Sequence, residues 1–285
     1  MQTILVTGCN GQLGSELRFL TEDFDEEDYR FIFTDVEELD ITDRQAVTNF
    51  VEEYQVNILI NCAAYTAVDR AEENFEKADL LNRVAPGYLA EAMDAVGGTM
   101  IHISTDYVFD GSAHIPYKED APTKPIGVYG RTKLAGEEEV ILGCTGSMVI
   151  RTAWLYSTFG NNFVKTMLRL GKEKDQLGVI FDQIGTPTYA RDLARTILHI
   201  VQQGIKPGVY HYTNEGVCSW YDFTRAIHRI AGIDHCHVKP LHTEEYPTPA
   251  PRPHYSVLDK TKIKEAFDIE IPWWEDSLKE CLDDM

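Results

Sequence analysis

The chain has 285 residues, of which 44% are hydrophobic and 25% are charged, as in an ordinary soluble globular protein. Its 26 basic and 46 acidic residues give a net charge of −20, which argues against a nucleic-acid partner, because such partners require basic patches. No apolar run of about 18 residues occurs, so we expect no membrane span. The first residues lack the pattern of a signal peptide and no CxxC pair occurs, so we predict a cytoplasmic protein with reduced thiols.

A glycine-rich turn between a strand and a helix opens the chain. Residues 3–7 predict the strand, and leucines from Leu13 onward predict the helix. Between them stand Gly8, Gly11 and Gly14, in a GxxGxxG spacing. Glycines permit a tight turn close to a pyrophosphate, and the helix N-terminus offers free N–H groups to that anion. We interpret this segment as a dinucleotide-binding unit; the alternative is a glycine-rich turn without a ligand.

The second predicted strand, residues 30–34, ends at Asp35, which follows Gly14 by 35 − 14 = 21 residues. An acidic residue at about this distance binds the ribose hydroxyls of the adenosine, and it favours NAD over NADP because a 2′-phosphate would meet a carboxylate. The alternative is that Asp35 is an ordinary loop acid. We expect the acidic run at residues 22–28 to be a solvated loop.

Helices and strands then alternate. We predict helices at residues 43–54 and 70–95, and strands at residues 57–62, 99–104 and 147–151. The strand that ends at residue 62 opens into Ala63 and Ala64, whose small side chains leave room for a flat ligand or simply pack there. The strand that ends at residue 104 presents Ser104 and Thr105 at the same edge of the sheet, where ligands of such sheets bind. One hydroxyl can bind a substrate carbonyl, and strand-end capping is the simpler function of the other.

A long loop at residues 110–125 leads into a helix that carries Tyr129 and Lys133. Side chains four residues apart lie on one face of a helix. A phenol titrates near pH ~10, and a fixed cation nearby lowers that pKa. A tyrosine tuned in this way can give a proton to a carbonyl oxygen. Alone this spacing is a weak signal, because most such pairs are a half-buried ring beside a solvated charge.

Five strands alternating with four helices predict an α/β fold with a Rossmann-like, doubly wound parallel sheet over residues 1–152. Residues 153–285 predict a smaller, mixed α/β part that mainly binds substrate, with elements from about 177–204 packing back on the sheet. The histidines at 235, 237 and 242 suggest zinc, but no cysteine pair completes a tetrahedral set. We predict a surface segment there, and no catalytic metal.

These residues resemble the extended short-chain dehydrogenases/reductases, through the GxxGxxG turn, Ser104-Thr105 and Tyr129-x-x-x-Lys133. Within that group, several stretches resemble the dTDP-4-dehydrorhamnose reductases: GQLGSEL, ELDITD, NCAAYTAVDRAE, STDYVFDG, YGRTKLAGE, RTAWLY and RPHYSVLD. The resemblance covers residues 8–259. It implies reduction, by NADPH or NADH, of the C4 keto group of dTDP-4-dehydro-L-rhamnose to dTDP-L-rhamnose, the last step in making that sugar donor.

The resemblance also implies roles for individual residues. Thr105, Tyr129 and Lys133 would be catalytic, with Ser104 as the alternative to Thr105. Thr105, Asp106 and Trp154 would contact the sugar nucleotide, although a buried core position is the alternative for Trp154. Lys133 would lower the pKa of Tyr129 and bind the nicotinamide ribose. Together with the glycine pattern, the cofactor contacts would come from Gly8, Gly11, Gln12, Leu13, Gly14, Asp35, Asp40, Ile41, Ala63, Ala64, Tyr65, Tyr129 and Lys133.

Some relatives dimerise through a metal bridged by acidic side chains, one of which matches Glu16, with Asp283 and Asp284 as candidate partners. We expect a monomer or a homodimer, and we keep a structural Mg²⁺ at a dimer interface as an option. Asp35 favours NAD, whereas the family tends to accept both cofactors.

The alternative functions are a non-catalytic regulatory subunit that resembles the methionine adenosyltransferase β subunit, and a nucleotide-sugar epimerase or dehydratase. A dehydratase of this group usually has an Asp-Glu pair after the strand-end hydroxyl, whereas Asp106-Tyr107 stands here.

Overall fold

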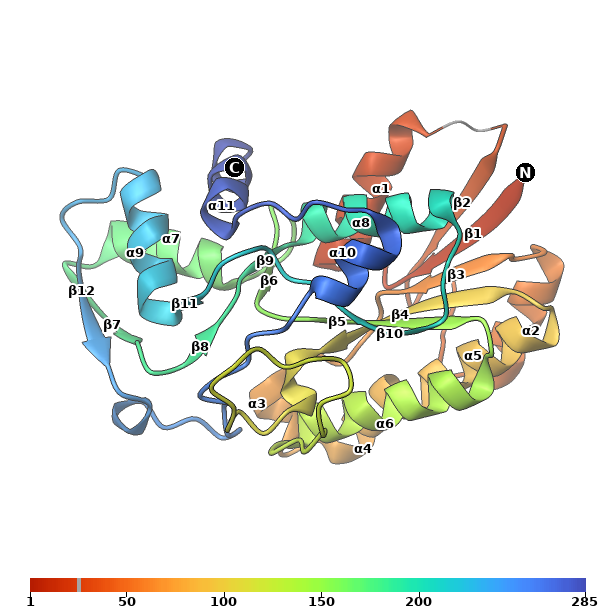
Figure 1. The fold of residues 1–285 in the computed structure, drawn as a ribbon, viewed down its shortest axis with the longest axis horizontal. Helices are drawn as coiled ribbons and strands as arrows, with labels where there is room; N and C mark the ends of the chain where they lie inside the picture. The colour runs from red at the N-terminus through yellow and green to blue at the C-terminus, as the bar shows by residue number, and fades with distance from the viewer. Residues whose placement is uncertain (25–26) are drawn as a thin grey trace.

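The chain folds into a larger part built on one sheet and a smaller part beside it (Figure 1). The structure is a computed structural model that describes residues 1–24 and 27–285. Residues 25 and 26 of the acidic run at 22–28 lie outside the described residues, and the run begins in the 3-10 helix η1 (Thr21–Asp23).

No helix in the described ranges is long and apolar enough to cross a membrane. All six cysteines are free thiols.

A parallel sheet forms the centre of the larger part. Its strands are β1 (Gln2–Thr7), β2 (Tyr29–Thr34), β3 (Ile58–Asn61), β4 (Thr99–Thr105), β5 (Ser147–Thr152) and β10 (Gly208–His211). Their order is β10-β5-β4-β3-β1-β2, and every neighbouring pair is parallel. The order reverses beside β1, as in a doubly wound fold. The predicted α/β fold class is therefore confirmed, and β10 adds a sixth strand from the later half of the chain.

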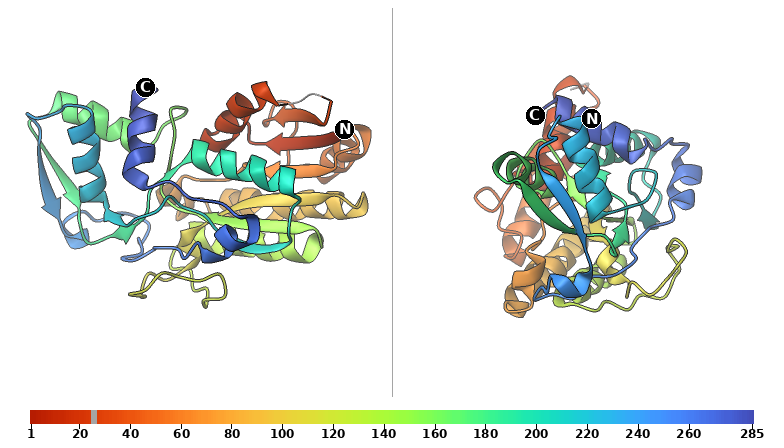
Figure 2. Two further views of the ribbon diagram at one scale, coloured as in Figure 1. Left: turned by 45° about the horizontal axis from the view of Figure 1, so that its top comes forward. Right: turned by 90° about the vertical axis from the view of Figure 1, so that its left-hand side faces the viewer.

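Helices cover both faces of this sheet (Figure 2). One face is covered by α1 (Gln12–Leu20), α8 (Ala190–Gln203) and α10 (Thr261–Phe267). The other is covered by α2 (Arg44–Glu53), α5 (Ala85–Ala95) and α6 (Val128–Gly143). Successive strand side chains point to opposite faces, so Ile4 and Val6 pack under the first set and Leu5 under the second. The strands read as continuous apolar runs because both faces are buried.

The helical stretch predicted at residues 70–95 is divided into several pieces. It contains α4 (Phe75–Asp79), the π-helical turn η2 (Leu80–Val84) and α5, and the short helix α3 (Val68–Ala71) precedes them. Asn82 in the π turn is fully buried. Its amide accepts from Tyr65 N–H at 2.8 Å and donates to Thr132 Oγ1 at 3.1 Å. The irregular turn therefore holds the loop after β3 against α6.

The smaller part has its own aromatic-rich core. Its main elements are α7 (Phe163–Glu173), β7 (Gln176–Ile180), α9 (Trp220–Ile230), β12 (His237–Leu241) and α11 (Trp274–Asp283). Short strands connect it to the sheet: β6 (Leu155–Tyr156), β8 (Ile184–Gly185), β9 (Thr188–Tyr189) and β11 (Cys218–Ser219). β7 pairs with β12, away from the main sheet, whereas α8 packs on it. Phe223 of α9 contacts the rings of Phe163 and Trp274, so α7, α9 and α11 share one core.

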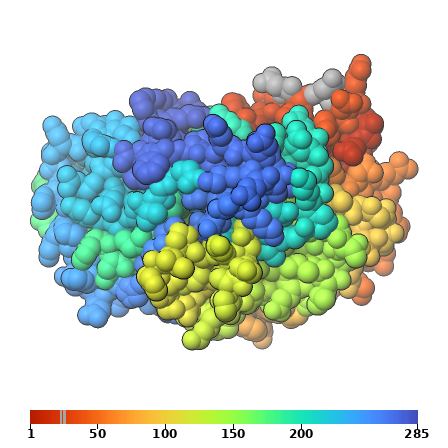
Figure 3. All heavy atoms as spheres, viewed as in Figure 1, coloured from red at the N-terminus to blue at the C-terminus, as the bar shows by residue number. Residues whose placement is uncertain are grey.

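The long loop after β4 is held by a segment from near the C-terminus. The loop begins with the 3-10 helix η3 (Asp106–Val108), and another 3-10 helix, η4 (Thr243–Glu245), precedes the late segment that holds the loop. Tyr117 N–H donates to Val257 O at 2.9 Å, and Asp259 N–H donates to Tyr117 O at 2.8 Å. Figure 3 shows the two segments meeting on the front face of the molecule. The loop that leads to α6 is therefore held in place by late residues.

We predict that Gly136→Ala destabilises the fold, because α6 and the π turn approach too closely for a side chain. A Cβ at Gly136 would lie 1.9 Å from the carbonyl oxygen of Asn82. In an exposed helix this substitution stabilises by about 1 kcal/mol, whereas overpacking costs about 1–3 kcal/mol. We therefore expect urea denaturation to show a lower free energy of unfolding. The control is Gly87→Ala in α5, whose Cβ would have only ordinary contacts, the nearest at 3.4 Å. Equal effects of the two variants would contradict the packing argument.

Candidate active site

A cavity of about 910 Å³ lies beyond the carboxyl ends of β1, β3 and β4. The sequence-predicted positions that line it are Gly8, Gly11, Gln12, Leu13, Gly14, Asp35, Asp40, Ile41, Ala63, Ala64, Thr105, Asp106, Tyr129, Lys133 and Trp154. Tyr65 is the predicted position that is absent from this lining, and its backbone N–H is bonded to Asn82 instead. Residues from six separate stretches of sequence are thus brought together at the expected edge of the sheet.

The glycine turn packs against the end of β3 so closely that side chains are excluded. Gly8 has φ +68°, and a Cβ there would lie 2.6 Å from Ala63 N. A Cβ at Gly14 would lie 2.5 Å from Gly8 O. The helix α1 starts after Gly11, whose position provides no side-chain cap, so the first N–H groups face the cavity unshielded. This bare, positively polarised end suits the pyrophosphate of a dinucleotide.

The carboxylate of Asp35, directly after β2, contacts the backbone of the glycine turn. Its Oδ2 accepts from Asn10 N–H at 3.1 Å, and its Oδ1 accepts from Val36 N–H at 2.8 Å. Asp40 holds the next turn through Thr42, and these hydrogen bonds lower the pKa of Asp40. Asp35 is therefore oriented by backbone groups at the cavity wall, where an adenosine ribose would lie next to a pyrophosphate on α1.

Tyr129, Lys133 and Thr105 also line this cavity. Burial raises the pKa of Tyr129, and a hydrogen bond with Thr105 opposes that rise. Burial lowers the pKa of Lys133 to about 8, although the nearby Glu137 carboxylate favours the ammonium. Lys133 Nζ donates to Ile103 O at 2.6 Å, so its main partner here is a backbone carbonyl. Burial drives both side chains toward their neutral forms.

The two strand-end hydroxyls have different partners. Ser104 donates a short hydrogen bond to Glu137, which is buried and ion-paired with Arg151 at 2.7 Å. Thr105 Oγ1 instead donates to Asp106 Oδ1 at 3.0 Å and contacts Tyr129. Ser104 thus helps to hold α6 against β4. Thr105 is the hydroxyl beside the reactive phenol, which favours it over Ser104 for the substrate carbonyl.

Asp106 is almost fully buried at the cavity wall, with 2% of its surface exposed. Burial raises the pKa of Asp106 to about 6, and hydrogen bonds from Ser256 and Thr105 oppose the shift. A carboxyl group with this pKa can take a proton near neutral pH more readily than an exposed aspartate. It can therefore accept from, or donate to, a hydroxyl that enters the cavity.

Trp154 forms an aromatic wall together with a residue that the sequence analysis missed. Its indole stacks on Trp220 with ring centroids 3.6 Å apart and planes at 11°. On the Gly185 side there is no room for a side chain, because a Cβ would lie 2.7 Å from Trp154 Cε2. Trp154 also has φ 49°, a conformation that is rare for a bulky residue. No spacing in the sequence links Trp220 to Trp154, since 66 residues separate them (220 − 154 = 66).

Comparison with known proteins decides the family. The model of the RmlD substrate binding domain family matches residues 1–285. The chain belongs to this family. The dTDP-4-dehydrorhamnose reductase of Aggregatibacter actinomycetemcomitans is 42% identical over 98% of both chains. The dTDP-4-dehydrorhamnose reductase structure from Clostridium acetobutylicum is 46% identical over 99% of both chains, with a TM-score of 0.94.

A further structure of this family carries a cofactor. The dTDP-4-dehydrorhamnose reductase from Bacillus anthracis, solved in complex with NADP, is 38% identical over 100% of both chains, with a TM-score of 0.95. The present chain is thus similar over its whole length to an enzyme that binds a nicotinamide dinucleotide. The glycine turn and the cavity at the end of α1 fit such a cofactor, because side chains are excluded along the path of the pyrophosphate.

The metal bridge considered at Glu16 does not fit this member of the family. Glu16 is fully buried: Ser157 Oγ donates to its Oε1 at 2.6 Å and Arg191 Nε donates to its Oε2 at 2.8 Å. Arg191 also holds Asp284, and Lys279 holds Asp283. Each candidate acid therefore already has a basic partner within the chain. Across residues 1–24 and 27–285, no group of three or more His, Cys, Asp and Glu side chains is arranged to hold a metal ion.

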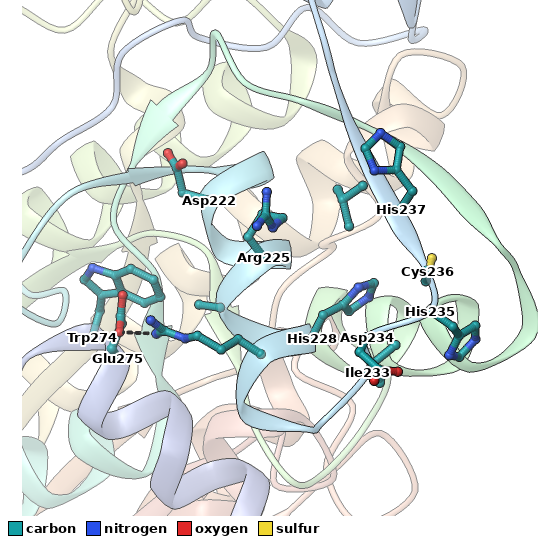
Figure 4. A pocket seen from close by; sticks show the side chains of 13 residues that line it. Asp222, Arg225, His228, Ile233, Asp234, His235, Cys236, His237, Trp274 and Glu275 are labelled. Atoms are coloured by element: carbon teal, nitrogen blue, oxygen red, sulfur yellow. Dashed lines mark hydrogen bonds and ion pairs between the residues drawn. The ribbon is translucent and has the colours of Figure 1, made fainter.

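The histidines at 235 and 237 lie in a different cavity, in the smaller part (Figure 4). It has a volume of about 720 Å³ and shares no lining residue with the cavity at the sheet edge. His235 and His237 are exposed, whereas Cys236 between them is buried, as alternation along an extended segment requires. His228 Nε2 of α9 donates to Met167 O at 3.0 Å. The segment is a surface feature, as predicted.

We predict that the guanidinium of Arg191, rather than a metal ion, neutralises Glu16. Arg191→Met leaves a buried carboxylate without its partner, which costs about 3–5 kcal/mol. Urea denaturation should show this loss, and EDTA should leave the midpoint of the unmodified protein unchanged. The control is Arg229→Met, which removes an ion pair whose arginine is 65% exposed, and which should change stability by at most about 1 kcal/mol. Destabilisation by EDTA would contradict this prediction.

Proposed function

We propose that this protein reduces the C4 keto group of dTDP-4-dehydro-L-rhamnose to give dTDP-L-rhamnose, with NADPH or NADH as the reductant, in the last step of dTDP-rhamnose biosynthesis. The observation that carries this proposal is the meeting of Thr105 and Tyr129 with the glycine turn in one cavity. The name of the 46% identical relative from Clostridium acetobutylicum supports the choice of substrate. The NADP in the relative from Bacillus anthracis supports the class of cofactor.

In this proposal Tyr129 is the acid. Because burial raises the pKa of Tyr129, the phenol holds its proton at neutral pH until negative charge develops on the substrate oxygen. The hydrogen bond with Thr105 stabilises the phenolate that remains. When bound, the nicotinamide supplies the hydride. Lys133, on the same face of α6, would bind the nicotinamide ribose and provide positive charge when protonated.

Binding is divided between the two parts of the molecule. We assign cofactor binding to residues 1–152 together with α8, and sugar-nucleotide binding mainly to residues 153–285. The aromatic wall of Trp154 and Trp220 supplies a flat apolar surface for a base or a sugar ring. Asp106 supplies a carboxyl group for a sugar hydroxyl. We place the protein in the cytoplasm, as a monomer or homodimer without nucleic-acid or membrane partners.

We predict that Tyr129→Phe lowers turnover by roughly 10²-fold or more, because it removes the general acid. Turnover is followed as loss of NADPH or NADH absorbance at 340 nm, with the 4-keto sugar nucleotide generated in situ. Cofactor binding, followed by fluorescence, should persist. The control is Tyr156→Phe, since Tyr156 is a buried tyrosine whose hydroxyl has no hydrogen-bond partner among the described residues. That variant should retain turnover.

Two results would exclude this mechanism. Near-normal turnover of Tyr129→Phe would remove Tyr129 from the chemistry. Absence of turnover in the unmodified protein, with cofactor binding intact, would favour the regulatory-subunit alternative and direct the search to a protein partner.

We predict that Asp35→Ala shifts cofactor preference toward NADPH. The carboxylate would accept hydrogen bonds from the adenosine ribose of NADH, and such a bond to a charged group contributes about 1.5–3 kcal/mol, or roughly 10- to 100-fold in affinity. The KM for NADH should rise by that order, while the KM for NADPH should fall, because the 2′-phosphate no longer meets a negative charge. The control is Glu37→Gln, which removes a nearby exposed charge outside the cavity lining. A parallel change for both cofactors would show that Asp35 does not select between them.

A further inference from the structure

A row of buried polar side chains crosses the sheet beneath Lys133. Thr7 on β1, Asn61 on β3 and His102 on β4 are neighbours in register, and each is at most 1% exposed. The neighbouring positions before them on the same face are apolar: Leu5, Leu59 and Met100 belong to the core there. A polar row in such a place must satisfy its hydrogen bonds internally, and this requirement fixes the orientation of every member.

The orientation follows from one backbone donor. Asn61 Oδ1 accepts from Ala63 N–H at 3.1 Å and from Thr7 Oγ1 at 2.8 Å. A backbone N–H can only donate, so this atom of Asn61 is the oxygen, and its Nδ2 is the atom that faces His102 Nδ1 at 3.0 Å. The amide must donate there, so Nδ1 accepts and the ring proton resides on Nε2. Burial and the charge of Lys133 hold the pKa of His102 well below its usual value, so the ring is neutral.

The Nε2 atom of His102 lies 3.4 Å from Lys133 Nζ. A protonated lysine has no lone pair, so an N–H directed at it opposes the ammonium, whereas a neutral amine can accept from that N–H. The carbonyl of Ile103 and the carboxylate of Glu137 favour the ammonium instead. Cys62, whose thiol also lies near Lys133, holds its proton, since burial raises the pKa of that thiol to about 12.

We propose that His102 is a positioning residue whose Nε2–H shifts the protonation equilibrium of Lys133 toward the neutral amine. Asn61, which Ala63 N–H orients, sets the tautomer, and the tautomer directs a donor at Lys133. Lys133 therefore loses its proton closer to neutral pH than burial alone would cause. The catalytic consequence rests on the proposed function, whereas the tautomer of His102 does not.

The test of the catalytic consequence is the pH dependence of turnover in two variants. His102→Leu removes the N–H but keeps Lys133 buried. The alkaline limb, along which activity is lost as Lys133 deprotonates, should move up by about one pH unit, or about tenfold in proton affinity. His102→Gln can direct an amide N–H at Lys133, so its limb should stay near that of the unmodified protein. Both variants alter packing, so a purely structural role would lower turnover in both without separating the two limbs.

Two further measurements keep the proposal testable if a variant does not fold. Nitrogen-15 NMR of histidine-labelled protein, without substrate, should show a neutral Nε2-protonated ring that does not titrate between about pH 6 and about pH 9 and whose signal disappears in His102→Gln. Thr7→Val should leave the alkaline limb in place, because Ala63 N–H still orients Asn61.

An Nδ1-protonated or titrating His102, or an alkaline limb that moves equally in the Leu and Gln variants, would overturn the proposal. If the NMR result holds while the unmodified protein reduces no 4-keto sugar, the proposed function fails and the tautomer assignment stands.

Discussion

The buried ion pair between Glu137 and Arg151 fixes the helix on which the reactive side chains depend. Its side chains are 2% and 5% exposed, and Glu137 also accepts from Ser104. One carboxylate of α6 is thereby joined to both β4 and β5, one turn beyond Lys133. Because removal of one partner from such a pair leaves an uncompensated buried charge, α6 has little freedom to shift along the sheet. The distance between the phenol of Tyr129 and the strand ends follows from this anchor.

Burial has opposite effects on the pKa values of the two reactive groups and the same effect on their charge. It raises the pKa of Tyr129 and lowers that of Lys133, so it favours the neutral form of each. The sequence argument considered only the attraction between phenolate and ammonium, which acts in the other direction. The phenol therefore keeps its proton until a substrate oxygen acquires negative charge, and it then stabilises that charge by proton transfer.

The sequence predicted those features that depend on local patterns. The strand, glycine turn and helix around Gly8 are contiguous, and Tyr129 and Lys133 share one helical face, so spacing alone locates them. Trp220 and the ion pair of Glu16 with Arg191 could not be predicted, because 175 residues separate the members of that pair and no periodicity joins them. Asn82 was missed for a related reason: its burial depends on a π turn, which the helical pattern of residues 70–95 does not indicate.

The late part of the chain both completes the cavity and holds its early wall in place. Arg252 donates to Asp69 at 2.8 Å, and its guanidinium lies 6.0 Å from the ring of Tyr107, which contacts Tyr129 edge-on. Trp220 supplies one side of the aromatic wall from the same half of the chain. The smaller part thus carries one side of the aromatic wall and also reaches the ring of Tyr129 through Arg252 and Tyr107. A shift of the smaller part would move both, which couples recognition of the substrate to the geometry around the phenol.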